Sequence, residues 1–228
     1  MKEAQLVLKP PVSKSMSTHL SAERIEALAV PMLLPAAALP AVIWEQLASD
    51  VDLLYRWNQR MNLTAVRDAE ELAAVHLGEC LRSAQLLPAG IASLLDFGSG
   101  AGLPGIPIQL ARPEIAVTLA ESQGKKAGFL REAVRVLGLK QATVYTGRVE
   151  AMPAAQRFEA VALRAVDAME VALPAAAARV DRGGWCVVLT TEAQAEPVRA
   201  LLPEMAWRTE AGLPGSKQRV VLVGQKQA

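Results

Sequence analysis

The residues best suited to chemistry follow a short apolar stretch, "SLLDF", at residues 93–97. An acid, Asp96, lies near its end, and glycines then alternate with other residues at Gly98, Gly100 and Gly102. Glycine has no Cβ, so a loop of this kind lets a ligand approach the backbone closely. An acid, a glycine loop and a following helix predict a nucleotide or nucleoside site at the end of a buried strand.

Two cofactors fit this loop. Gly100, Gly102 and Gly105 satisfy the dinucleotide fingerprint Gly-x-Gly-x-x-Gly, which places a pyrophosphate at a helix N-terminus. The alternative is the Asp-x-Gly-x-Gly-x-Gly loop of methyltransferases, which wraps the methionine part of S-adenosylmethionine. Asp96 favours the second, because a carboxylate beside the loop repels a pyrophosphate and suits a cationic ligand. Glu121 ends the next apolar run, where a carboxylate accepts hydrogen bonds from ribose hydroxyls in either cofactor.

The sequence after Pro88 alternates between apolar runs and helical stretches. Strands are expected at 93–97, 116–120, 142–146, 160–164 and 185–190, and helices at about 104–112, 124–138, 167–180 and 193–202. This alternation predicts a parallel sheet covered on both faces. Two last strands, at 206–210 and 218–224, are expected to add one antiparallel strand. The predicted fold is a doubly wound, mostly parallel seven-stranded α/β sheet.

Two amphipathic helices are expected before the sheet. Residues 40–62 carry apolar side chains at helical spacing. A second helix is expected over 68–87, where Asp68 and Glu71 have the spacing of a capping box. We therefore predict three parts: a poorly ordered extension at 1–35 with a short helix in "SAERIEALAV", a helical cap at 36–90 and a catalytic domain at 91–228.

The composition excludes some classes of protein. A formal net charge of +1 over 228 residues excludes recognition of nucleic acid by overall charge, so any basic patch is local. Cys80 and Cys186 have no paired spacing and indicate reduced thiols in a cytoplasmic protein. His19 and His76 form no zinc motif, and no apolar run reaches the ~20 residues of a membrane helix. We expect no metal and no membrane partner.

Six sequence blocks resemble a known family. They lie between about Pro40 and Gln225 and read "WNQRMNLTAVRDAEELAAVH", "LLDFGSGAGLPGIPIQLA", "VTLAESQGKKAGFLREAV", "YTGRVE", "LRAV" and "LPGSKQRVVLV". In this order they are similar to the bacterial 16S rRNA guanine-N7 methyltransferases, also called glucose-inhibited division protein B. The resemblance implies a Rossmann-like class I methyltransferase that uses S-adenosylmethionine. Its substrate would be N7 of one guanosine in the decoding-region hairpin of 16S rRNA, within the small ribosomal subunit or an assembly intermediate.

The resemblance also implies roles for individual residues. The glycines would contact the methionine part of the cofactor, Glu121 the ribose, and the residues after the third strand the adenine. The implied cofactor site comprises Asp96, Gly98, Ser99, Gly100, Gly102, Leu103, Glu121, Ser122, Arg148, Val149, Glu150 and Arg164. Arg164 would lie beside the methyl group. The residues expected to contact RNA are Asn62, His76, Lys125, Lys126, Lys217 and Arg219.

Methylation at guanine N7 requires no general base, because N7 carries a lone pair and no proton. The enzyme must align that lone pair behind the methyl group, and such alignment supplies roughly 7–11 kcal/mol in the best intramolecular cases. Arg164 suits a positioning role, since its guanidinium binds guanine O6 or a phosphate in a defined plane.

The chain departs from the family pattern in two places. The block "HLGECL" has Glu79 and Cys80 where the family has aspartate and serine, and Thr190 and Thr191 replace a common lysine-glycine pair. Three alternative functions remain at this level: a methyltransferase on another substrate, an NAD-dependent oxidoreductase, and a non-catalytic RNA-binding factor in ribosome assembly.

Overall fold

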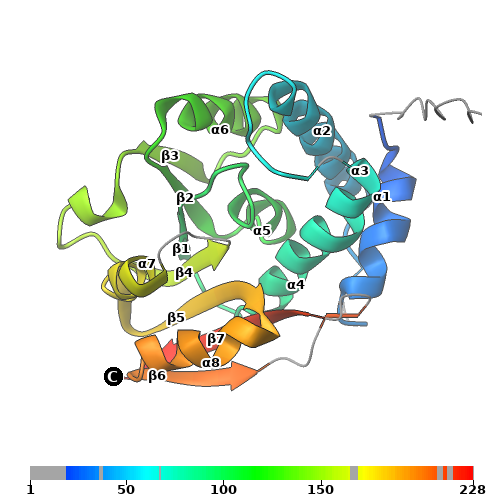
Figure 1. Cartoon of the computed structure of the whole chain (residues 1–228). Helices are drawn as coiled ribbons and strands as arrows, with labels where there is room; N and C mark the ends of the chain where they lie inside the picture. Colours follow the sequence, from blue (N-terminus) through cyan, green and yellow to red (C-terminus); the bar gives the residue numbers. More distant parts are fainter. Residues whose placement is uncertain are drawn as a thin grey trace, which may run out of the picture.

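The computed structural model describes residues 19–35, 38–66, 68–164, 169–209, 213–214 and 218–227. Its centre is a seven-stranded sheet with the order β3-β2-β1-β4-β5-β7-β6 (Figure 1). The strands are β1 (Ser93–Phe97), β2 (Ala116–Glu121), β3 (Ala142–Thr146), β4 (Phe158–Arg164), β5 (Val180–Thr191), β6 (Met205–Thr209) and β7 (Arg219–Lys226). Only β7 is antiparallel to its neighbours, β5 and β6. The predicted doubly wound, mostly parallel sheet is confirmed.

Helices cover both faces of this sheet. They are α1 (Ala22–Ala29), η1 (Val30–Met32), α2 (Ala41–Asn58), α3 (Ala69–Glu71), η2 (Leu72–Leu77), α4 (Gly78–Leu86), α5 (Gly105–Ala111), α6 (Gly124–Val136), η3 (Val149–Ala151), α7 (Met169–Ala177) and α8 (Glu192–Leu201). Adjacent residues of β1 point to opposite faces, as a strand requires: Leu94 packs with α5 and α6, and Leu95 packs with α7 and α8.

The strand order reverses between β1 and β4. β1 pairs in parallel with β2 on one side and with β4 on the other. The register places Phe97 beside Leu163, so the loop after β1 and the last residue of β4, Arg164, lie at the same edge. Ligands bind at such a reversal in open α/β sheets, because the two following connections diverge there and leave a crevice.

The N-terminal helices share one hydrophobic core with the sheet. Leu47 of α2 and Leu81 of α4 belong to the same buried cluster as Leu94 and Ile106. Two side chains of α2 also donate hydrogen bonds to α6 and its C-cap residue. Gln46 donates to the carbonyl of Leu137 (2.8 Å), and Trp57 donates to the Glu132 carboxylate (3.2 Å). The helical cap therefore packs firmly on the α/β part, and domain boundaries at residues 35 and 90 stay a prediction.

Residues 19–35 contain α1 and η1, and the extension expected at 1–35 stays a prediction. The short helix predicted in "SAERIEALAV" is present as α1, where the Ser21 side chain accepts a hydrogen bond from the Arg24 amide. Ile25 and Met32 are buried in the main core. A Cβ on Gly78 would lie 2.6 Å from Met32 Cγ, so the glycine in "HLGECL" is what lets this segment pack against α4. Residues 1–18 lie outside the described part of the chain.

The helix predicted over 68–87 is interrupted. It runs as α3, η2 and α4, and the central segment η2 is π-helical. Asp68 caps its start by accepting a hydrogen bond from the Glu70 amide, 2.9 Å. A π-helical turn takes up an extra residue and occurs frequently at functional sites. Here it carries His76, which is buried. None of the described helices is long and apolar enough to cross a lipid bilayer.

Asp50 is the one ionisable residue among the buried residues of α2. It is 1% exposed, and burial raises its pKa from the usual 3.8 to about 7. Protonation of Asp50 therefore stabilises the folded state. This stabilisation is complete below pH 3.8 and is lost as the pH rises through about 7.

We expect Asp50→Asn to stabilise the protein at pH 8 by about 1–3 kcal/mol, because a neutral amide replaces a desolvated carboxylate. The gain should shrink toward pH 4.5. Thermal unfolding at both pH values measures it, and Glu45→Gln, an exposed site on the same helix, is the control. A gain of equal size at both pH values would contradict this role of the Asp50 charge.

Candidate active site

A cavity of about 790 Å³ opens at the carboxyl ends of β1, β2 and β4. One wall is the loop after β1, and a second is the end of β2 with Glu121 and Ser122. The third wall combines His76 of η2 with Arg164 of β4 and Arg219 of β7. The strand-order reversal thus holds a single cavity lined both by the glycine loop and by a cluster of basic side chains.

The glycines of the loop serve two different purposes. Gly100 has a φ of +53°, and a Cβ there would meet only the Gly98 carbonyl at 3.8 Å, so its α-carbon faces open space in the cavity. Gly102 has a φ of +80°, but its Cβ would lie 2.3 Å from Ile106 Cδ1. Gly100 therefore leaves room for a ligand, whereas Gly102 leaves room for α5 and does not line the cavity.

Asp96 does not line the cavity. It is fully buried beneath the loop, where its Oδ2 accepts a hydrogen bond from the Gly105 amide at 3.1 Å. Burial raises its pKa to about 7. Its sequence position predicts a carboxylate next to a cationic ligand, but even-numbered residues of β1 point into the face that α5 covers, so Asp96 anchors the start of α5. A contact of Asp96 with the cofactor stays a prediction.

Glu121 occupies the position expected of a ribose-binding carboxylate. It lines the cavity and is 6% exposed. Its Oε2 accepts a hydrogen bond from the Gly100 amide (3.0 Å) and its Oε1 accepts one from the Gln123 amide (2.7 Å). A carboxylate offers about four lone-pair sites, so both oxygens retain acceptor capacity toward a ligand. Glu121 therefore holds the loop in shape while facing the cavity.

The fourth wall was not predicted. It is the segment Leu63–Val66, which follows α2. Asn58 shapes it, because its side-chain oxygen accepts hydrogen bonds from the amides of Leu63 (2.9 Å) and Thr64 (3.1 Å). The block "WNQRMNLTAV" contains these residues, but nothing in their types signals a cavity wall. Only the shape of the folded loop brings them to the site.

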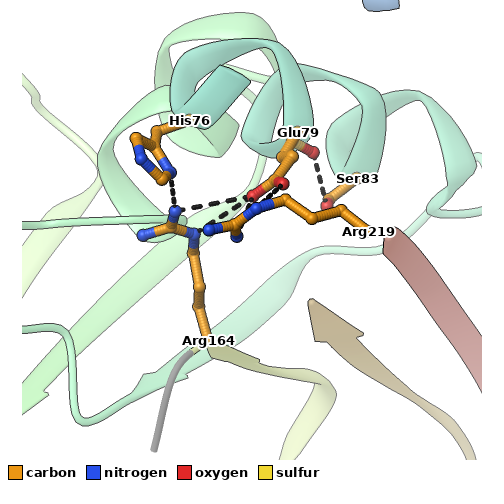
Figure 2. A network of polar contacts seen from close by, with 5 residues as sticks. All are labelled: His76, Glu79, Ser83, Arg164 and Arg219. Carbon is orange, nitrogen blue, oxygen red and sulfur yellow. Dashed lines mark hydrogen bonds and ion pairs between the residues drawn. The ribbon is translucent and has the colours of Figure 1, made fainter. Parts of the chain in front are cut away.

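A network of polar contacts closes the basic end of the cavity (Figure 2). Arg164 donates to Nδ1 of His76, and its Nε lies 3.4 Å from Glu79 Oε2. Arg219 reaches the same carboxylate from β7, with its Nη1 3.2 Å from Oε2 and its Nε 3.1 Å from Oε1. In the sheet, Arg219 is the register partner of Thr191, one of the two threonines that replace the family's lysine-glycine pair.

Burial dominates the electrostatics of this network. Burial first, and then the charges of Arg164 and Arg219, lower the pKa of His76 from the usual 6.5 to about 3. His76 is therefore neutral near pH 7, which agrees with its role as acceptor for Arg164. Burial also raises the pKa of Glu79, and the charges of Arg164 and Arg219 oppose that rise. Burial raises the pKa of the neighbouring Cys80 thiol, which is unpaired and inert in this setting.

The structure brings together most of the predicted site residues. Those that line the cavity are Gly98, Ser99, Gly100, Leu103, Glu121, Ser122, Arg148, Arg164, His76, Lys126 and Arg219. Those that do not are Asp96, Gly102, Val149, Glu150, Asn62 and Lys125. Val149 instead fills the core under α7, while Glu150, Asn62 and Lys125 are exposed. Lys217 lies outside the described residues.

The donor set fits S-adenosylmethionine. Gly100 leaves open space beside the loop, Glu121 offers carboxylate acceptors, and Leu63, Phe97 and Leu103 add apolar side chains to the lining. No group of three or more His, Cys, Asp or Glu residues among the described positions is arranged to hold a metal ion.

Comparison with known proteins identifies similar sequences. A family model described as GidB, rRNA small subunit methyltransferase G, matches residues 43–213. The ribosomal RNA small subunit methyltransferase G of Stenotrophomonas maltophilia (strain K279a) is 45% identical over 60% of this chain, and the match spans 63% of that relative's own length. The protein of the same name from Xanthomonas campestris pv. campestris (strain B100) is 34% identical over 94% of this chain and 96% of its own length.

Solved structures share the fold at low sequence identity. A predicted O-methyltransferase from Agrobacterium tumefaciens superposes with a TM-score of 0.55 and 17% identity, over 66% of this chain and 81% of that one. A precorrin-6y C5,15-methyltransferase from Geobacter metallireducens GS-15 gives a TM-score of 0.52 with 14% identity, over 73% and 93%. At this identity the likeness establishes the architecture alone.

Substitutions at Gly100, which faces the cavity, and at Gly102, which packs against α5, should cause different defects. We expect Gly100→Val to abolish S-adenosylmethionine binding, because the side chain enters the cavity, and to lower stability only by about 1–2 kcal/mol of backbone strain. Gly102→Val should instead destabilise the fold by more, because it collides with Ile106. Isothermal titration calorimetry and thermal unfolding of both variants measure this. Normal cofactor binding by Gly100→Val would contradict the placement of the ligand.

Proposed function

Because this chain belongs to the GidB family of rRNA small subunit methyltransferases, we propose that it transfers the methyl group of S-adenosylmethionine to N7 of a guanosine in 16S rRNA. The observation that carries the proposal is the shared cavity. One cavity of about 790 Å³ is lined at one end by the glycine loop and the Glu121 carboxylate, and at the other end by a cluster of basic side chains.

The residues of this chain would mainly bind and orient. The loop and Glu121 would hold the cofactor, which supplies an electrophilic methyl group when bound. No residue needs to remove a proton from guanine N7, and neutral His76 is occupied as the acceptor for Arg164. Arg164, with only 13% of its side chain exposed, presents a guanidinium whose position is set by its neighbours. Such rigid presentation suits alignment of a planar base or a phosphate.

The RNA would enter over the basic side of the cavity. Lys126 of α6, Arg148 before η3 and Arg219 of β7 line it. These cations contact phosphates without reading sequence, so they favour binding without specifying a site. With a formal net charge of +1 for the whole chain, binding to short free RNA would be weak. We therefore propose that the substrate is structured, either the small ribosomal subunit or an assembly intermediate, and that the reaction takes place in the cytoplasm.

The direct test uses small ribosomal subunits that lack the modification. The purified protein is incubated with them and with methyl-labelled S-adenosylmethionine, and the rRNA is digested to nucleosides for mass spectrometry. We expect the label in 7-methylguanosine, at a position that fragment mapping then identifies. Cofactor binding without label in any nucleoside would contradict the proposed reaction and favour a non-catalytic role in assembly.

Arg164→Ala tests the positioning role in the same assay. We expect kcat to fall by about 100-fold, since alignment is lost while the cofactor contacts of the loop remain. Arg131→Ala, which removes a cation bonded to Thr146 at the edge of the sheet, is the matched control and should leave kcat within about threefold. Equal losses in both variants would contradict a specific role for Arg164.

A further inference from the structure

The Glu79 carboxylate lies between two guanidinium groups. It is 1% exposed as a residue, and its oxygens contact Arg164 at 3.4 Å and Arg219 at 3.1 and 3.2 Å (Figure 2). Both arginines line the cavity, whereas Glu79 lies behind them and does not. Glu79 therefore cannot contact a ligand directly, but it acts on the two groups that can.

Glu79 is the one carboxylate among the residues of this network in Figure 2. The charge of Arg164 also acts on Asp96, which is buried beneath the loop and whose pKa burial raises to about 7. His76 accepts a hydrogen bond from Arg164 through Nδ1, so that nitrogen carries no proton, and the ring is neutral. Without Glu79, the mostly buried guanidinium of Arg164 and the partly exposed one of Arg219 would stand together at this end of the cavity. Charges interact strongly where water is excluded, so their combined field would extend to any ligand in the cavity.

The other charged side chains of the lining balance one another, so they would not neutralise the field of the two arginines. Lys126 and Arg148 add two more cations to its lining, and the carboxylates there are Glu71 and Glu121. The ligand that the proposed function requires is itself a cation, since the sulfur of S-adenosylmethionine carries a positive charge. The sulfonium must approach the arginine end for the methyl group to meet the base.

We propose that Glu79 is the counterion that makes this cavity compatible with a cationic sulfonium. This inference rests on the proposed function and adds a specificity determinant to it: Glu79 sets the preference for the charged substrate cofactor over its neutral product. By neutralising one guanidinium, it lets Arg164 stand near the reacting centre without repelling the cofactor. Glu79 is a positioning residue, because it acts through Arg164 and Arg219.

S-adenosylmethionine and S-adenosylhomocysteine separate this role from packing. The two differ by the methyl group and its positive charge, so a purely structural defect weakens both, whereas an electrostatic defect weakens the cation selectively. We expect Glu79→Gln to weaken S-adenosylmethionine about tenfold more than S-adenosylhomocysteine, as measured by titration calorimetry. Glu196→Gln removes the same charge from the exposed surface of α8 and should leave the ratio of the two dissociation constants unchanged.

Two more variants separate charge from shape. Glu79→Asp keeps the charge on a shorter side chain, so it should preserve the ratio even if both ligands bind more weakly. The double variant Glu79→Gln/Arg219→Gln removes one charge of each sign and should restore the ratio. If Glu79→Gln does not fold, Arg219→Gln alone serves, and it should shift the preference toward S-adenosylmethionine.

The outcomes distinguish this inference from the proposed function. Equal weakening of both ligands by Glu79→Gln, or an unchanged preference in Arg219→Gln, overturns the counterion role while the wild-type protein still binds and methylates. A wild-type protein that binds neither ligand overturns the proposed function and the counterion role together. A selective loss of S-adenosylmethionine that the double variant reverses supports the proposal.

Discussion

Parallel pairing of β1 with β4 is the constraint on which the site depends. It sets Phe97 beside Leu163, and therefore brings the loop after β1 and Arg164 to one edge of the sheet, although 66 residues lie between the two strand ends in the sequence. Since β2 pairs with the other side of β1, Glu121 reaches the same loop. A register shift of one residue would turn each of these side chains to the opposite face.

The rigidity of the loop follows from what is packed beneath it. Asp96 is buried against the start of α5, and Gly105 allows that helix to approach β1 and β2 closely. Gly102 leaves room for Ile106 of the same helix. These residues have the sequence pattern of a ligand site, yet they serve packing. The part of the loop that lines the cavity is Phe97–Ala101 together with Leu103, and Asp96, Gly102 and Gly105 lie outside that lining. The burial of Asp96 raises its pKa and costs stability, which the backbone hydrogen bond from Gly105 offsets.

The other end of the cavity depends on the N-terminal helices. η2 and α4 deliver His76 and Glu79 to the arginines of β4 and β7, and α1 and η1 hold that helix in place through the contact of Met32 with Gly78. The cap is thus part of the site itself. Its removal would leave Arg164 and Arg219 without their buried partners, so binding and folding of this region are coupled.

The amino-acid sequence alone determined the element order, the one antiparallel strand and the glycine loop, because hydrophobic periodicity and glycine spacing are local properties. It also pointed to Glu121, Arg164, His76 and Arg219. Tertiary structure alone decided which of these face the cavity: Asp96 and Val149 turn into the core, and Leu63–Val66 enter the wall through Asn58. The tertiary structure also places Glu79, which stands where the family has aspartate, in ion pairs with both Arg164 and Arg219. Side-chain direction and burial depend on contacts between distant segments, which no local pattern encodes.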